Sequence, residues 1–237
     1  MRILYAGDSR AGGSANYLLG VLRFLRAGVT HVPPGKILSP SYFRRRYDAI
    51  LLSDFSRKDL PAASERALAR QVEKGAGLLM IGGWASFNGP YGKWGGSLVE
   101  KLLPVTCVSG DDRVNLPGGA WIVEKKKHPA FRGLSFKNPP VICGLNQVRP
   151  KKNSLVALKA RRLQDKKEFP LLVIHRGPRL RTAALTTDLA PHWSGGLTDW
   201  GLKRRRLLVK RGIRVEVGDQ YARFISSLLR WMTRQAG

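Results

Sequence analysis

An apolar strand that runs directly into paired glycines constrains the fold more than any other stretch of this chain. Residues 77–81 read Gly-Leu-Leu-Met-Ile, and Gly82, Gly83 and Trp84 follow at once. A short apolar run that ends in glycines predicts a buried strand followed by a tight turn. In enzymes with a nucleophile elbow, a turn of this kind carries the Ser or Cys that attacks the substrate. Here glycine or tryptophan fills every candidate position, so the sequence predicts the turn without its nucleophile.

Short apolar segments alternate with amphipathic segments through the N-terminal half of the chain. A first helix is expected after Ser14, whose hydroxyl can cap it, and a second over residues 61–74. Strands that alternate with helices in this way favour a parallel sheet covered on both faces. Ligand sites in such sheets lie at the carboxyl ends of the strands. The predicted strands are residues 3–6, 29–32, 47–54 and 78–81.

The pattern changes in the second half of the chain. Residues 97–103 predict a helix, and about 109–182 then read as a β-rich elaboration. A basic insertion at about 202–214 precedes a terminal helix over 221–231, whose apolar residues recur at helical spacing. We expect all these parts to belong to one domain over residues 1–237.

The charge balance is strongly basic. Lys and Arg number 42 against 16 Asp and Glu, which gives a formal net charge of +26. Such a surface attracts polyanions, so nucleic acid or an acidic protein is a candidate partner through the Lys/Arg clusters. A solvated charged face explains the clusters equally well, because no recognition motif or interleaved aromatic residues accompany them. The clusters are residues 125–127, 151–152, 161–162, 166–167 and 203–206.

The two cysteines point to a reducing compartment. Cys107 and Cys143 sit among apolar residues, with no CxxC motif and no Cys/His cluster at metal-ligand spacing. Buried free thiols are therefore expected. No apolar run approaches the ~20 residues that a membrane span needs, and the first residues read as a strand rather than a leader. We expect a cytoplasmic protein with no membrane span, and the sequence indicates no cofactor and no metal site.

A set of motifs in fixed order carries a family resemblance. They are residues 47–54 (YDAILLSD), 75–84 (GAGLLMIGGW), 103–107 (LPVTC), 111–113 (DDR), 128–133 (HPAFRG), 146–150 (NQVRP) and 187–193 (TDLAPHW), with Phe87. Together they resemble the glutamine amidotransferase-like family, which lies near trehalose-utilisation-type proteins. The likeness covers about residues 2–200 and the terminal helix. It implies an α/β fold with a flavodoxin-like, three-layer parallel sheet of the class I glutamine amidotransferase type.

The chain departs from the catalytic motifs of true class I amidotransferases, and this departure predicts no glutaminase activity. A working glutaminase needs a Cys thiolate activated by a His that a carboxylate orients. Neither the GxCxG elbow nor the His-Pro-Glu signature of true class I amidotransferases occurs in this chain. Gly83 or a neighbour occupies the nucleophile position, and Cys107 and Cys143 lie in different sequence contexts.

Polar residues follow several predicted strands and form the candidate site. Asp8 and Asp54 follow two of them, and Asp188 and His192 follow the strand expected over 181–187. If that strand is parallel to the others, all four reach one rim. His192, with Asp188 to orient it, could then serve as an acid/base or ligand contact. The alternative is that the carboxylates cap helices or fix turns, and that His192 belongs to a packing corner.

An aromatic, glycine-rich segment over residues 84–96 adds Trp84 to the candidate site. Its four aromatic side chains suit a carbohydrate or planar ligand, or else they cover the open end of the sheet. The ligand-binding candidates are Asp8, Asp54, Gly83, Trp84, Asp188 and His192.

Three hypotheses for function follow. The leading one is a non-glutaminase member of the family that binds a small polar ligand at the strand-end cleft. The second is a basic binding or assembly module for nucleic acid or an acidic partner. The third is a hydrolase that uses His192 and a metal held by Asp8, Asp54 and Asp188, although no spacing rule singles out such a site.

Overall fold

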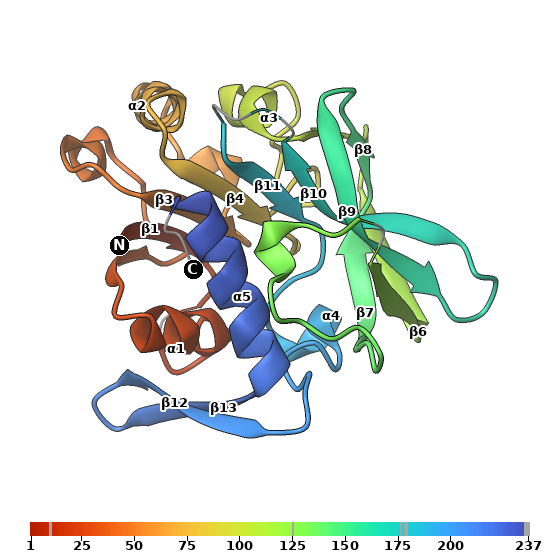
Figure 1. The fold of residues 1–237 in the computed structure, drawn as a ribbon. Coiled ribbons are helices and arrows are strands. Elements are labelled where there is room, and N and C mark those ends of the chain that lie inside the picture. The colour runs from red at the N-terminus through yellow and green to blue at the C-terminus, as the bar shows by residue number, and fades with distance from the viewer. Residues whose placement is uncertain (10, 125, 176, 178–179, 235–237) are drawn as a thin grey trace.

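The centre of the molecule is a nine-stranded sheet with the order β2-β1-β3-β4-β11-β10-β9-β6-β7 (Figure 1). The computed structural model describes residues 1–9, 11–124, 126–175, 177 and 180–234, so residue 125 of the first basic cluster lies outside it. Five neighbouring strands run parallel to one another. These are β1 (Arg2–Gly7), β2 (Gly28–Val32), β3 (Ala49–Ser53), β4 (Gly77–Ile81) and β11 (Thr182–Leu185).

The other four strands of this sheet are antiparallel to their neighbours. The chain leaves the parallel part after β4, builds these strands, and returns through β11, which pairs with β4 on one side and β10 on the other. Because β11 is parallel to β4, with Leu185 opposite Ile81, the residues after both strands come to the same edge. The four strands are β6 (Arg113–Glu124), β7 (Val141–Asn146), β9 (Ser154–Arg162) and β10 (Glu168–His175).

Helices cover both faces of the parallel part, as Figure 1 shows. Successive residues of β1 alternate between two cores: Ile3 and Tyr5 pack in one, and Leu4 and Ala6 in the other. This alternation is what a strand buried on both faces requires, and it confirms the predicted three-layer α/β fold. One core is completed by α1 (Asn16–Phe24) and α5 (Asp219–Met232), the other by α2 (Ala62–Glu73) and α3 (Leu98–Leu102).

Two small antiparallel sheets lie outside the main one. The strands β5 (Val105–Cys107) and β8 (Val148–Pro150) pair with each other. The basic insertion folds as a hairpin of β12 (Arg204–Lys210) and β13 (Ile213–Gly218). Its buried Leu207 and Val217 belong to the core that α1 covers, while the Arg and Lys side chains along β12 are exposed.

The remaining elements are short, and one predicted cap is wrong. Helix α1 begins at Asn16 with Ala15 at its N-cap, and the Ser14 hydroxyl instead bonds Ser9 at 3.1 Å. None of the described helices is long and apolar enough to cross a membrane. The short elements are the 3-10 helices η1 (Pro40–Arg44), η2 (Arg57–Asp59) and η3 (Pro129–Phe131) and the α-helix α4 (Pro191–Ser194).

The close approach of β1 and β3 at their carboxyl ends depends on Gly7. Its φ is 130°, and a Cβ atom there would lie 1.6 Å from the carbonyl oxygen of Ser53. We expect Gly7→Ala to lower the free energy of unfolding by at least about 3 kcal/mol, because it combines backbone strain with a clash against backbone. Urea unfolding followed by circular dichroism measures the change. Gly28→Ala is the matched control, since the nearest atoms to its Cβ are 4.0 Å away; equal stability of the two variants would contradict the prediction.

Candidate strand-end site

The carboxyl ends of β1, β3, β4 and β11 place polar residues along one edge of the sheet. Asp8 follows β1, and Asp54 follows β3 directly. Both have a φ of 50°, the left-handed region that non-glycine residues rarely adopt. Asp8 also donates its backbone N–H to the Ser53 carbonyl at 2.8 Å. The same unusual backbone geometry at two neighbouring strand ends turns the chain out of the sheet at this edge.

The carboxylate of Asp54 occupies the turn that follows β4. Its Oδ1 accepts the backbone N–H of Ala85 at 2.5 Å, and the N–H of Trp84 also bonds this carboxylate. A Cβ atom on Gly83 would lie 2.6 Å from the same oxygen. The Asp54 carboxylate therefore fills the space that a nucleophile's side chain would need. It also takes up backbone N–H groups of the kind that stabilise an oxyanion in acyl-transfer enzymes.

Asn146 and Asp112 hold the other side of this turn. The buried Asn146 side chain accepts the N–H of Gly83 at 2.9 Å and donates to the Gly83 carbonyl at 3.1 Å and to Asp112 at 2.7 Å. Asp112 also accepts the N–H of Asn88 at 2.6 Å. Burial raises the pKa of Asp112 to about 6. Sequence reasoning missed both roles, because Asn146 ends β7 in the distant antiparallel part of the sheet.

Asp8 belongs to a buried polar group beneath the rim. The hydroxyl of Tyr5 donates to the Asp8 carboxylate, and the Tyr5 ring stacks on His31 with 4.6 Å between ring centroids. Burial raises the pKa of Asp8 to about 6, although the Tyr5 hydrogen bond acts in the opposite direction. Burial also lowers the pKa of His31, whose Nε2 lies 2.9 Å from the Gly7 carbonyl oxygen.

Asp188 reaches the same edge from β11. Its Oδ1 accepts the N–H groups of Ala190, which precedes α4, and of Ser194, which ends it, each at 3.1 Å. Burial raises the pKa of Asp188 to about 7, and the negative charges of Asp8 and Asp54 raise it further. Burial likewise raises the pKa of Asp54. The structure thus brings the three predicted carboxylates close enough to influence one another's ionisation.

Tyr221 completes this group, and sequence reasoning did not find it. It is fully buried near the start of α5, and its hydroxyl has no hydrogen-bond partner among the described residues. Burial raises its pKa well above the ordinary value, and Asp8 and Asp188 raise it further. A buried hydroxyl without a partner is costly, so this group is a candidate donor to a ligand or water at the rim.

The hydrogen bonds of the described carboxylates do not include His192. Its side chain on α4 is exposed and, within the described part of the chain, makes no hydrogen bond to Asp8, Asp54 or Asp188. The neighbouring Trp193 is buried, and its Nε1 donates to Asn115 at 3.1 Å. The packing interpretation of this corner therefore accounts for Trp193.

The aromatic segment divides into core and surface residues. Phe87 and Trp94 are fully buried, whereas Trp84 is 42% and Tyr91 61% exposed. The guanidinium of Arg113 lies 4.2 Å above the Trp84 ring. Only part of the segment therefore covers the sheet, and the Trp84 ring is a partly exposed aromatic surface that contacts the Arg113 guanidinium.

Neither thiol is placed to replace the missing nucleophile. Cys107 lies in β5, where burial raises its pKa well above the ordinary value, and Cys143 lies in β7. No hydrogen bond joins either sulfur to an imidazole in the described ranges. Among the same residues, no three His, Cys, Asp or Glu side chains are grouped so that they could hold a metal ion.

These features define a class I glutamine amidotransferase-type α/β protein with glycines at the turn after β4. A family model described as "Putative glutamine amidotransferase" matches residues 14–209. The chain belongs to this family. No curated protein sequence matches it at a significant level.

Solved structures share the fold over nearly the whole chain. Cytoplasmic Protein STM3548 from Salmonella typhimurium is 23% identical with a TM-score of 0.75, and the match covers 97% of this chain and 98% of that one. Cytoplasmic Protein STM1381 from Salmonella typhimurium LT2 is 25% identical with a TM-score of 0.71 and the same coverage. A ThuA-like protein from Bacteroides uniformis ATCC 8492 is 13% identical, with a TM-score of 0.57 over 98% of this chain and 91% of that one.

Installing a thiol at the turn tests whether Asp54 occupies the nucleophile's space. We expect Gly83→Cys to destabilise the fold by about 3 kcal/mol or more and to produce no glutaminase activity. Adding Asp54→Ala should recover part of that loss, because it removes the atoms that the new side chain meets. A double-mutant cycle of urea unfolding measures this coupling. Strictly additive effects would show that the two side chains do not compete.

The raised pKa of Asp188 predicts a pH dependence of stability. Its folded pKa of about 7 lies above the unfolded value near 4, so the folded chain binds more protons between these values. Stability should fall as the pH rises through this window and level off above it. We expect Asp188→Asn, which keeps the acceptor oxygen, to reduce that fall by about 1–3 kcal/mol.

Urea unfolding between pH 4.5 and 8.5 measures the effect. Asp199→Asn, which removes an exposed carboxylate, is the matched control. Its stability should fall with rising pH as much as that of the parent chain. A fall that is as steep in Asp188→Asn as in the parent would contradict the assignment to Asp188.

Proposed function

We propose that this protein is a member of the family without glutaminase activity that binds a small polar ligand at the strand-end rim. The observation that carries the proposal is the Asp54 carboxylate at the turn after β4. It takes the N–H of Ala85 and lies where a side chain on Gly83 would project. When it is ionised, a carboxylate in that position repels a thiolate, a carbonyl oxygen and a developing oxyanion alike.

The chemistry of the rim favours a ligand that donates hydrogen bonds. Asp8, Asp54 and Asp188 supply acceptor oxygens, and burial raises the pKa of all three carboxyl groups. The partnerless hydroxyl of Tyr221 adds one donor or acceptor. Trp84, whose ring contacts the Arg113 guanidinium, is the partly exposed aromatic side chain of the turn after β4. Polyols, sugars and small amines combine hydroxyl or ammonium donors with an apolar face, so they match this set of groups.

A binding screen joined to an activity assay tests the proposal. We expect no release of glutamate from glutamine, and a rise in melting temperature with at least one hydroxyl-rich or amine ligand. Asp8→Asn and Asp188→Asn should each weaken that binding about tenfold, because each replaces a charged acceptor by a neutral one. Asp199→Asn is the control and should bind as the parent does. His192→Ala shows whether α4 contributes a contact.

Two outcomes would overturn the proposal. One is glutamate release that disappears with Cys107→Ser, since it would make a buried thiol the nucleophile. The other is ligand binding that neither Asp8→Asn nor Asp188→Asn affects, since the ligand would then bind elsewhere.

A second candidate function rests on the β12–β13 hairpin. Arg205, Arg206 and Arg214 are exposed on it, and Arg204 pairs with Asp199 at 3.0 Å. An exposed basic hairpin of this kind suits nucleic acid or an acidic protein, and its binding should weaken steeply as salt is added. Loss of such binding in the Arg205→Ala/Arg206→Ala double variant would support it.

A further inference from the structure

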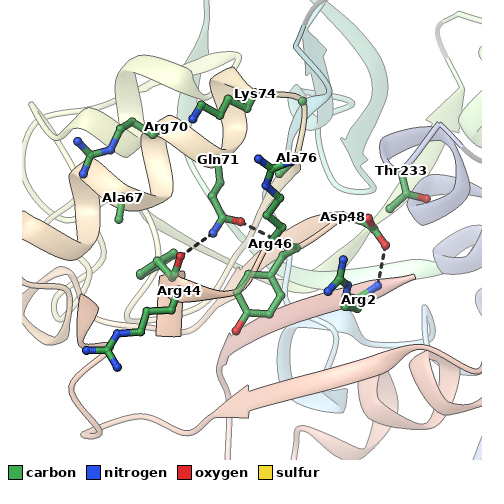
Figure 2. A pocket seen from close by; sticks show the side chains of 13 residues that line it. Arg2, Arg44, Arg46, Asp48, Ala67, Arg70, Gln71, Lys74, Ala76 and Thr233 are labelled. Atoms are coloured by element: carbon green, nitrogen blue, oxygen red, sulfur yellow. Dashed lines mark hydrogen bonds between the residues drawn. The ribbon is translucent and has the colours of Figure 1, made fainter. Parts of the chain in front are cut away.

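A separate pocket of about 520 Å³ lies at the opposite edge of the sheet, where the parallel strands begin. Arg2 opens β1, Asp48 precedes β3, and Ala76 precedes β4. The C-terminal half of α2 forms the facing wall (Figure 2). Because the strand-end rim lies at the carboxyl ends of the same strands, the two sites lie at opposite edges of the sheet.

The lining of this pocket is strongly basic. Five cationic side chains contribute, and one carboxylate, Asp48, which accepts the backbone N–H of Arg2 at 2.7 Å. Within the described residues, none of the five cationic side chains makes an ion pair or hydrogen bond with the protein. The cationic residues are Arg2, Arg44, Arg46, Arg70 and Lys74.

Gln71 holds two walls of the pocket together. Its Nε2 donates to the carbonyls of Arg45 at 2.7 Å and Phe43 at 3.3 Å, and its Oε1 accepts the N–H of Tyr47 at 3.0 Å. Figure 2 shows this side chain between α2 and the segment before β3. Arg44 and Arg46 lie on that segment, so their backbone is set in place before any ligand binds. A preorganised arrangement of this kind lowers the entropy cost of binding.

The grouped positive charges repel one another, and an anionic ligand would reduce this repulsion. Arg70 on α2 and Lys74, the C-cap residue that follows this helix, are four residues apart, and like charges at that spacing repel each other. Guanidinium groups bind phosphate oxygens in bidentate fashion, with stronger hydrogen bonds than neutral donors make. A volume of about 520 Å³ is in the range of small-molecule sites. Five cations against one carboxylate exceed what a single phosphate would neutralise.

We propose that this pocket binds a small anion that carries two or more linked phosphate groups. Nucleic acid fits the site less well, because the lining has only two aromatic residues, of which Tyr47 is buried and Phe43 is partly buried. The exposed β12–β13 hairpin is the better surface for a long polyanion. The phosphate chain could be free or could belong to a nucleotide, which the experiment distinguishes.

Calorimetry on the full chain, with inorganic tripolyphosphate as the probe, tests the proposal. We expect saturable one-to-one binding, with sulfate at equal ionic strength at least about tenfold weaker. Arg46→Ala and Arg70→Ala should each weaken binding about tenfold. Gln71→Ala should weaken it too, although it removes no charge. Arg66→Ala, which loses one exposed cation from α2 outside the pocket, should change the dissociation constant less than about twofold.

Equal losses in Arg66→Ala and Arg70→Ala would overturn the proposal, since they would show attraction by the diffuse charge alone. Tighter binding of a single-stranded oligonucleotide, lost in the Arg205→Ala/Arg206→Ala variant, would overturn it in favour of the hairpin. If ATP binds more tightly than tripolyphosphate, the pocket recognises a nucleotide together with its phosphate groups. If the two bind equally tightly, the pocket recognises the linked phosphates alone. Asp8→Asn should leave tripolyphosphate binding unchanged. The experiment therefore tests the basic pocket separately from the proposed ligand site at the strand-end rim.

Discussion

The hydrogen bonds of the Asp54 carboxylate to the turn after β4 determine what the strand-end edge can do. They place a negative group where this fold would otherwise present a nucleophile, and they engage the N–H of Ala85 that would otherwise be free. The left-handed backbone at Asp54 and the missing side chain at Gly83 are both needed for this contact. Asn146 braces the turn from the other side. The side chains of Asp54 and Asn146 therefore hold this turn from both sides.

The two ends of the parallel strands have opposite chemistry. At the carboxyl edge, partly buried carboxylates with raised pKa values lie near the Tyr221 hydroxyl, which has no partner among the described residues. At the amino edge, unpaired arginines surround an open pocket that Gln71 keeps in shape. Burial makes charge costly at the first edge, whereas exposure to water makes it inexpensive at the second. The large net positive charge of the chain thus says little about the rim, where the local groups are acidic.

Much of the parallel half could be predicted, because its signals are local. Apolar strands, glycine turns and the periodicity of α2 and α5 lie within short windows, and an aspartate that follows a parallel strand must reach the carboxyl edge. The predicted Ser14 cap was wrong, because Ser9 competes for its hydroxyl. Tyr221, Asn146 and Asp112 were missed, because each joins the rim from an element far away in the sequence. The cations of the second pocket were missed for the same reason.

The sequence by itself determined the layered α/β fold, the family and the absence of an elbow cysteine, since these depend on residue type and short-range order. Only the tertiary structure decided that Asp54 fills the vacant turn, that His192 stays outside the carboxylate hydrogen bonds, and that scattered arginines meet around one pocket. Those outcomes depend on how β11 inserts beside β4 and how α2 packs against the segment before β3. Such long-range placements leave no periodic pattern in the chain.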